Sequence, residues 1–218
     1  MRNLLFLIAA AGLVAGAAPA RADRVQVFSL TGLHCADCGV TIQHAVKKVK
    51  GVKKMVFDYH TVEATITMSD QVTDGQILGA IRAAETGFGA TPGAGHGAYQ
   101  PFPAYPESAD VAVLTNDGSA VGRLDSLRVA GKYTVFDVYA EWCMPCRAMD
   151  AALRGAVENR RDIAVRRLNV VSFDSALAKE LGAGLRALPY VVVFAPDGKR
   201  TAVTGLHAKK VLEALAAK

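Results

Sequence analysis

Beyond its first 22 residues, the 218-residue sequence has no long apolar segment. No later stretch approaches the roughly 18 consecutive apolar residues that a membrane-spanning helix requires. The chain also has no collagen-like or low-complexity repeat, and it has only four cysteines. Charged residues make up 21% and hydrophobic residues 51% of the chain, which is enough apolar material for packed cores. This composition excludes a disordered chain, a fibrous protein and a small disulfide-rich scaffold.

The excess of positive charge is small, and part of it lies at the N-terminus. The formal net charge of +5 falls to +3 when Arg2 and Arg21 are set aside. A basic surface of the kind that attracts nucleic acid is therefore not indicated. We predict no nucleic-acid partner.

The first 22 residues are typical of a secretory signal peptide. They combine a positive start, an apolar run from Leu4 to Val14 and small residues at Ala20 and Ala22. We expect residues 1–22 to be removed, which predicts a periplasmic protein with no transmembrane span after cleavage. The alternative is an uncleaved anchor, because Leu4 to Ala20 is apolar for 17 residues.

A segment rich in glycine, proline and alanine divides the rest of the chain. This segment, residues 93–109, predicts a linker between a unit at residues 23–92 and a unit at residues 110–218. In the first unit, strand and helix signals follow one another in an order that predicts a ferredoxin-like βαββαβ domain. The expected strands lie near residues 25–30, 55–59, 62–68 and 87–89, and the expected helices lie near residues 42–49 and 77–84.

The second unit also alternates strands with helices. Its expected strands are residues 111–114, 120–122, 133–140, 163–168, 190–194 and 201–204, the first two forming a small leading hairpin. Its expected helices lie near residues 146–157, 176–181 and 211–215. This order predicts an α/β domain whose mixed sheet is covered on both faces.

The four cysteines form two Cys-x-x-Cys pairs, Cys35 with Cys38 and Cys143 with Cys146, one in each unit. Such a pair at the start of a helix places two thiols near unpaired N–H groups, which lowers thiol pKa values. The thiolate is both a nucleophile and a metal ligand, so the flanking residues decide between the two chemistries. Purely structural disulfides are a weaker alternative, because a bridge across two residues closes too short a loop to constrain the unfolded chain much.

The first pair lies in the loop between the first strand and the first helix of its unit. Two thiolates in such a loop suit a soft ion of low coordination number, above all Cu(I), whereas a closed tetrahedral zinc site needs two more ligands. His34 adjoins Cys35, and we expect its side chain to point outward, as a residue beside a ligand usually does.

The pattern Gly32-x-x-Cys35-x-x-Cys38, together with the hairpin and Gly87-Phe88, resembles the heavy-metal-associated domain. This family includes small copper chaperones, copper-pumping ATPases and periplasmic mercury-binding proteins. Leu33 replaces the methionine that is usual in the family and keeps an apolar anchor under the loop. The resemblance implies that Cys35 and Cys38 bind the metal.

The second pair follows a strand that is expected to be buried. Trp142 would cover the thiol, and Pro145 suits a first helical turn because its missing N–H is not needed there. Asp137 is an acidic residue within this apolar strand, where burial would raise its pKa and make it a proton acceptor for a buried thiol. The alternative is that Asp137 is exposed on a strand edge.

The segment from Phe136 to Arg147 resembles the active site of a thioredoxin, and the likeness extends over residues 110–218. It implies Cys143 as the exposed attacking thiol, Cys146 as the resolving thiol and Asp137 as the buried acid/base. Pro189 would be the cis-proline that shapes the substrate groove. The sequence departs from cytosolic thioredoxins at three positions, Met144, Tyr190 and Arg167, so the direction of the redox reaction stays open.

Together these patterns predict an exported thiol-disulfide oxidoreductase with a fused copper-binding domain. Its partners would be a protein thiol or disulfide, such as that of a copper metalloprotein, and a protein that donates or accepts electrons. One alternative is a periplasmic metallochaperone whose thioredoxin-like unit mainly recognises a partner. Another is general disulfide formation or isomerisation. A further hypothesis explains the fusion: the second pair returns an oxidised first pair to the dithiol that binds metal, or it exchanges disulfides with the partner that receives the metal.

Overall fold

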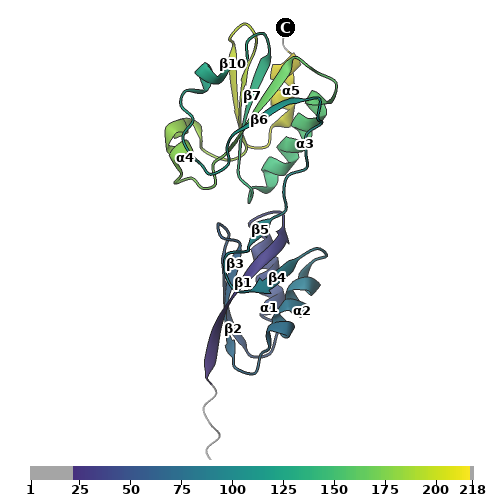
Figure 1. Cartoon of the computed structure of the whole chain (residues 1–218), viewed down its shortest axis with the longest axis vertical. Coiled ribbons are helices and arrows are strands. Elements are labelled where there is room, and N and C mark those ends of the chain that lie inside the picture. The colour runs from purple at the N-terminus through teal and green to yellow at the C-terminus, as the bar shows by residue number, and fades with distance from the viewer. Residues whose placement is uncertain (1–21, 217–218) are drawn as a thin grey trace, which may run out of the picture.

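The computed structural model describes residues 22–216, which form two α/β domains stacked end to end (Figure 1). The predicted signal peptide lies outside the described residues, except for Ala22. None of the helices between residues 22 and 216 has the length and apolar content needed to span a bilayer.

The N-terminal domain has the predicted βαββαβ order and one additional short strand. Its elements are β1(Asp23–Leu33), α1(Cys38–Val46), β2(Val52–Asp58), β3(Glu63–Ser69), α2(Asp74–Ala84), β4(Gly89–Pro92) and β5(Ala98–Tyr99). The sheet runs β2-β3-β1-β4 with antiparallel neighbours, and β5 pairs in parallel with the end of β1. Thr73 caps α2 through a reciprocal capping box with Gln76. Phe28, Ile42 and Ile81 are fully buried in one core between the helices and the sheet.

The C-terminal domain is the predicted mixed sheet with helices on both faces. Its elements are β6(Asp110–Thr115), the 3-10 turn η1(Leu124–Leu127), β7(Tyr133–Tyr139), α3(Met144–Glu158), β8(Ile163–Asn169), α4(Ala176–Leu181), η2(Gly182–Gly184), β9(Tyr190–Phe194), β10(Arg200–Thr204) and α5(Ala208–Ala216). The strand order is β10-β9-β7-β8-β6. Alternate residues of the central strand β7 enter two separate cores: Val135 packs with side chains of α3 and α5, and Phe136 packs with side chains of α4.

The predicted leading hairpin of this domain is wrong. Residues 120–122 are not a strand, and β6 pairs in parallel with β8 at the edge of the sheet. The Asn-Asp-Gly turn signal at Asn116–Gly118 is present, but the chain that follows it runs to η1 instead of returning along β6. A local turn signal specifies only a change of chain direction. The strand with which β6 pairs depends on which strand of the sheet has an unpaired edge.

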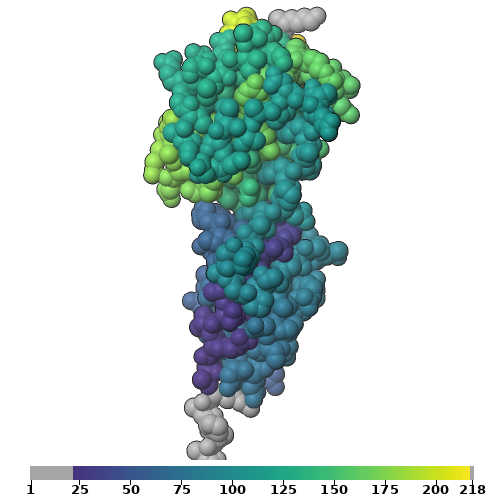
Figure 2. Space-filling model, viewed as in Figure 1, coloured from purple at the N-terminus to yellow at the C-terminus, as the bar shows by residue number. Residues whose placement is uncertain are grey.

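The expected linker is shorter than predicted. Residues 93–100 belong to the first domain, because β5 extends its sheet and the Gln100 N–H donates to the Leu33 carbonyl at 2.7 Å. Farther along, the aromatic rings of Phe102 and Tyr105 pack against the cores of the C-terminal domain. Both halves of the segment are therefore anchored, and the two domains lie in contact (Figure 2).

Candidate functional site: two cysteine pairs in one groove

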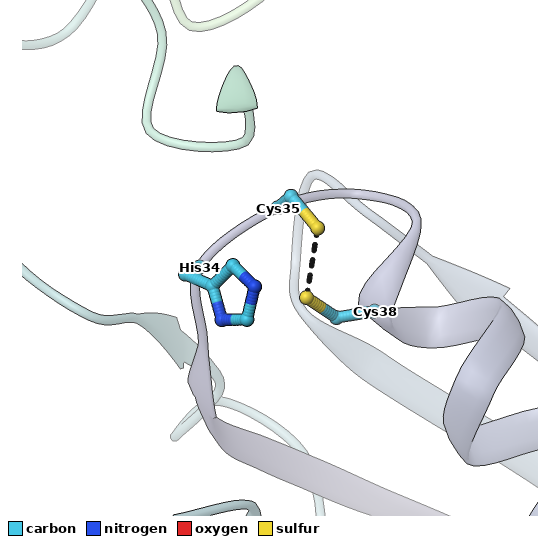
Figure 3. Close-up of side chains that lie close together, drawn as sticks. All are labelled: His34, Cys35 and Cys38. Atoms are coloured by element: carbon cyan, nitrogen blue, oxygen red, sulfur yellow. Dashed lines mark hydrogen bonds between the residues drawn. The ribbon is translucent and has the colours of Figure 1, made fainter. Parts of the chain in front are cut away.

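The first cysteine pair lies where β1 ends and α1 begins. Cys38 is the first residue of α1, and Cys35 lies in the preceding loop (Figure 3). Gly32 is required here because its φ is +83° and a Cβ at this position would lie 2.0 Å from the Gly87 carbonyl oxygen. Leu33 is fully buried under the loop, as expected. The two cysteines are free thiols with their sulfurs 2.8 Å apart, and one donates a hydrogen bond to the other.

His34 does not point away from the thiols, contrary to expectation. A ring nitrogen of His34 and the sulfurs of Cys35 and Cys38 all lie within 4.8 Å of one another (Figure 3). The imidazole also lies beside the Phe88 ring, 6.4 Å between centroids. Two thiols and a half-buried imidazole are a donor set that suits a soft or borderline ion. Burial, followed by the hydrogen bond with Cys38, raises the pKa of Cys35 to about 11, so a bound ion would displace a proton at neutral pH.

The second pair forms a disulfide at the start of α3. Cys143 is the N-cap residue of this helix, and its sulfur accepts a hydrogen bond from the Cys146 backbone N–H at 3.2 Å. Pro145 lies in the first turn, as predicted. The expected exposure of Cys143 is wrong, because only 3% of this residue is exposed, compared with 1% of Cys146. Cys143 lies at the contact between the domains, and its neighbour Trp142 packs on both cores.

Asp137 is buried in the central strand β7, which excludes the strand-edge alternative. It pairs in register with Arg167 on β8, and the Arg167 Nε lies 3.3 Å from a carboxylate oxygen of Asp137. Burial raises the pKa of Asp137 to about 6, although the Arg167 charge acts in the opposite direction. The carboxyl therefore changes its protonation state near neutral pH. Pro189 follows a cis peptide bond, as the thioredoxin likeness implies.

Comparison with known proteins agrees with this division of the chain. Residues 27–88 match the model of the heavy-metal-associated domain, and residues 125–218 match that of thioredoxin. The chain is a fusion of these two families. In the described residues, the fold of each part is the one that its family implies: a βαββαβ domain, then a thioredoxin fold.

Three similar proteins each match one of the two domains. The mercuric transport protein periplasmic component of Salmonella typhi is 37% identical over 73 residues, which are 33% of this chain and 80% of that protein. The chloroplastic thioredoxin F-type of Spinacia oleracea is 33% identical over 92 residues, which are 42% of this chain and 47% of that protein. The solved structure of oxidised MerP from Ralstonia metallidurans CH34 is 26% identical, with a TM-score of 0.30, and the match covers 33% of this chain and 97% of that one.

The heavy-metal-associated and thioredoxin domains each place one cysteine of their pair, Cys35 and Cys143, on one groove of about 440 Å³. Residues Cys35–Asp37 of the metal-binding loop form one wall. The other wall consists of Trp142–Pro145, Phe173 and the segment Arg186–Leu188 that precedes the cis-proline. Sequence reasoning identified both pairs but gave no sign that they meet.

Sequence reasoning also missed the residues around Asp137. Asp150 on α3 is fully buried and lies 3.2 Å from the Arg167 guanidinium, so two carboxylates share one arginine. Tyr105 from the linker is half-buried, with its ring centroid 5.6 Å from the Arg167 guanidinium carbon. Asp150 follows Cys146 by four residues, a spacing that puts both side chains on one face of a helix. That spacing could have identified Asp150 from the sequence, whereas no feature of the sequence near Tyr105 indicated its position beside Arg167.

The donor set of the metal loop leads to a prediction about His34. In the full chain with Cys143 and Cys146 changed to serine, we expect tighter binding of Cu(I) than of Zn(II), and we expect Cys35→Ser or Cys38→Ser to abolish Cu(I) binding. His34→Ala should weaken Zn(II) binding at least about tenfold but change Cu(I) binding little, since two thiolates suffice for Cu(I). Competitive titration with chromogenic chelators under reducing conditions measures both.

The matched control is His44→Ala, because His44 lies on the exposed side of α1 in the same domain. This variant should leave both affinities unchanged. Tighter zinc than copper binding by the parent protein would contradict the two-thiolate interpretation. Loss of Cu(I) binding in the His34 variant would contradict it as well.

Proposed function

We propose that this protein is an exported thiol-disulfide oxidoreductase of the periplasm whose heavy-metal-associated domain binds Cu(I). Its substrate would be the thiols or disulfide of a metal site, in this chain or in a metalloprotein. The observation that carries the proposal is the shared groove, to which the free thiol pair of the metal-binding kind contributes Cys35 and the disulfide of the thioredoxin kind contributes Cys143.

The chemistry of the thioredoxin pair follows from its position. The Cys143 sulfur receives a backbone N–H and lies at the positive end of α3, so the reduced thiol is stabilised as a thiolate. This thiolate attacks a substrate disulfide and forms a mixed disulfide, which the Cys146 thiolate then breaks. Asp137 would accept the proton of Cys146 above pH 6. A dithiol protein must afterwards reduce the Cys143–Cys146 disulfide, and a disulfide partner would drive the reverse reaction.

The metal specificity rests on the donors. Cys35, Cys38 and His34 offer two sulfurs and one nitrogen, without a carboxylate in the cluster, in the part of the chain that the structure describes. Such a set favours soft ions, of which Cu(I) needs the fewest ligands. The name of the Salmonella relative refers to mercury and to the periplasm, which supports a soft metal and an exported location.

A periplasmic metallochaperone is the second candidate. The observation that favours it is the low exposure of Cys143, which is 3%. In that case the thioredoxin domain would serve to recognise a partner, and its thiols would not be needed for metal transfer. The two functions differ in what they require of Cys143.

The test separates the cysteine pairs in the full chain. Changing Cys143 and Cys146 to serine should abolish the acceleration of insulin reduction by dithiothreitol while leaving Cu(I) binding at Cys35 and Cys38. Changing Cys35 and Cys38 to serine should have the reverse effect. If the intact protein does not accelerate insulin reduction, the oxidoreductase proposal is wrong and the metallochaperone remains.

A further inference from the structure

We infer that the metal-binding loop is itself a substrate of the thioredoxin domain, and that Cys143 reduces an oxidised Cys35–Cys38 pair through a Cys35–Cys143 mixed disulfide held in place by Arg147. This inference rests on the proposed oxidoreductase function and specifies its substrate. It depends on the contacts between the domains, which the sequence did not predict.

The metal-binding loop lies in the place where a substrate of the thioredoxin domain would bind. The groove beside Cys143 is walled by Trp142 and by the segment before the cis-proline, and residues Cys35–Asp37 line its opposite side. The Ala36 backbone N–H donates to the Trp142 carbonyl oxygen at 3.1 Å. This bond joins the residue after Cys35 to the residue before Cys143, and it anchors the loop as a peptide substrate would be anchored.

The groove also distinguishes between the two cysteines of each pair. Cys35 and Cys143 line it, whereas Cys38 and Cys146 do not. Both cysteines of the metal loop are buried in the first core, but Cys38 is the first residue of α1 and only Cys35 also faces the groove. The sulfur of Cys35 is therefore the one that Cys143 attacks.

Arg147 connects the redox helix to the metal loop. Its Nε donates to the His34 carbonyl oxygen at 2.8 Å, although the two residues are 113 positions apart in the chain. Its Nη atoms donate to the carbonyl oxygens of Gln100 and Pro101, and its guanidinium lies over the Phe102 ring at 4.5 Å. One side chain of α3 thus holds both the metal-binding loop and the segment that follows β5, so Arg147 is a positioning residue.

The reaction balances without a metal. The Cys143 thiolate attacks the Cys35 sulfur, the Cys35–Cys38 bond breaks, and Cys38 leaves as a thiolate that takes up a proton. The Cys146 thiolate then attacks the Cys143 sulfur, and Cys35 leaves as the second thiol. Two electrons pass from the thioredoxin pair to the metal pair, and the products are the disulfide and the free thiols that the structure contains. An external dithiol protein restores the thioredoxin pair.

A trapping experiment in the full chain tests the inference. With Cys38 and Cys146 changed to serine, only Cys35 and Cys143 remain, and mild oxidation with diamide should join them within one chain. We expect this cross-link to form at a rate independent of protein concentration, and at least ten times faster than the Cys38–Cys143 cross-link of the matched variant with Cys35 and Cys146 changed to serine. Non-reducing electrophoresis and peptide mass mapping measure both rates.

Arg147 is tested in the same trapping variant. Arg147→Ala should slow the cross-link several-fold, and Arg147→Lys should restore part of the rate, because lysine retains the charge and a donor but not the fork of N–H groups. The thermal unfolding midpoint of each variant separates a lost positioning contact from a loss of folding. Unchanged cross-linking in a folded Arg147→Ala variant would remove Arg147 from the inference.

Equal rates for Cys35 and Cys38, or a rate proportional to protein concentration, would overturn the inference. The insulin assay on the intact protein distinguishes failure of this inference from failure of the proposed function. If insulin is reduced but no intrachain cross-link forms, the enzyme acts only on external proteins. If insulin is not reduced, the proposed function fails whatever the cross-linking shows.

Discussion

Asp137→Asn is expected to raise the free energy of unfolding at pH 7 by about 2 kcal/mol and to slow disulfide reduction at least about tenfold. Burial raises the pKa of Asp137 from 3.8 to about 6, so the folded protein at pH 7 contains a buried carboxylate that costs stability. A shift of roughly two units corresponds to about 3 kcal/mol. Arg167 loses a charged partner in the Asp137→Asn variant, which reduces the expected gain in the free energy of unfolding.

The raised pKa of Asp137 determines how the stability of the protein changes with pH. Below pH 3.8 the carboxyl is protonated in both the folded and the unfolded chain, and it costs nothing. Between pH 3.8 and about 6 the unfolded chain releases the proton while the folded chain keeps it, so this group lowers stability as the pH rises. Above pH 6 the cost is constant. The advantage of the variant should therefore grow from pH 4 to pH 6 and then level off, which urea unfolding at several pH values measures.

The slower disulfide reduction expected of Asp137→Asn has a different cause from its higher stability. Asparagine cannot accept the proton of Cys146, so the rise in the rate of insulin reduction near pH 6 should disappear in the variant. Asp150→Asn is the matched control, because Asp150 is the other buried carboxylate on Arg167. It should lower stability, since Arg154 and Arg167 both lose a partner. Parallel stability curves for Asp137→Asn and the parent protein would refute the assignment of Asp137 as the buried acid.

Cys143 is expected to react with iodoacetamide about a hundred times faster than Cys146 after reduction at pH 7. Its sulfur lies at the N-terminus of α3 and accepts the Cys146 N–H, two features that favour the thiolate. The thiolate is the form that reacts with the reagent, so the thiol whose charged form is stabilised reacts first. Cys146 is 1% exposed and does not line the groove, so the reagent has less access to it.

The measurement is mass mapping after limited labelling. The full chain with Cys35 and Cys38 changed to serine removes competing thiols and leaves the thioredoxin pair unaltered. Although only 3% of Cys143 is exposed, it lines the groove between the domains, and a small reagent can enter there. If Cys146 were labelled first, the roles of attacking and resolving thiol would have to be exchanged.

Local sequence patterns determined most of the secondary structure and both chemistries. The β2–β3 hairpin, the capped helix α2 and the buried strand β7 each leave a signal within about ten residues, because side-chain periodicity and caps act at short range. The two cysteine pairs were recognisable for the same reason. A Cys-x-x-Cys spacing at a helix start carries its chemistry in four residues, and the family matches agree with this interpretation.

Partner choice among strands depended on the tertiary structure. The signals near residues 111–122 suited a hairpin, yet β6 pairs with β8, which offers a free edge beside β7. The glycine- and proline-rich composition of residues 93–109 suited a free linker, yet β5 completes the first sheet and Phe102 and Tyr105 pack on the second domain. Composition describes the intrinsic flexibility of a segment, while the surfaces beside it decide whether it stays free.

The meeting of the two cysteine pairs is likewise a property of the folded chain alone. Asp150, Tyr105 and Arg147 act through partners from other elements, and the hydrogen bond from Arg147 to the His34 carbonyl spans 113 positions. No periodicity or spacing in the sequence encodes contacts between residues so far apart in the chain, since they form only when separate elements of the fold pack together. The sequence by itself specified a metal-binding pair and a redox pair in separate domains. Only their packing placed one cysteine of each pair, Cys35 and Cys143, on one groove, because docking brings the loops that follow β1 and β7 together.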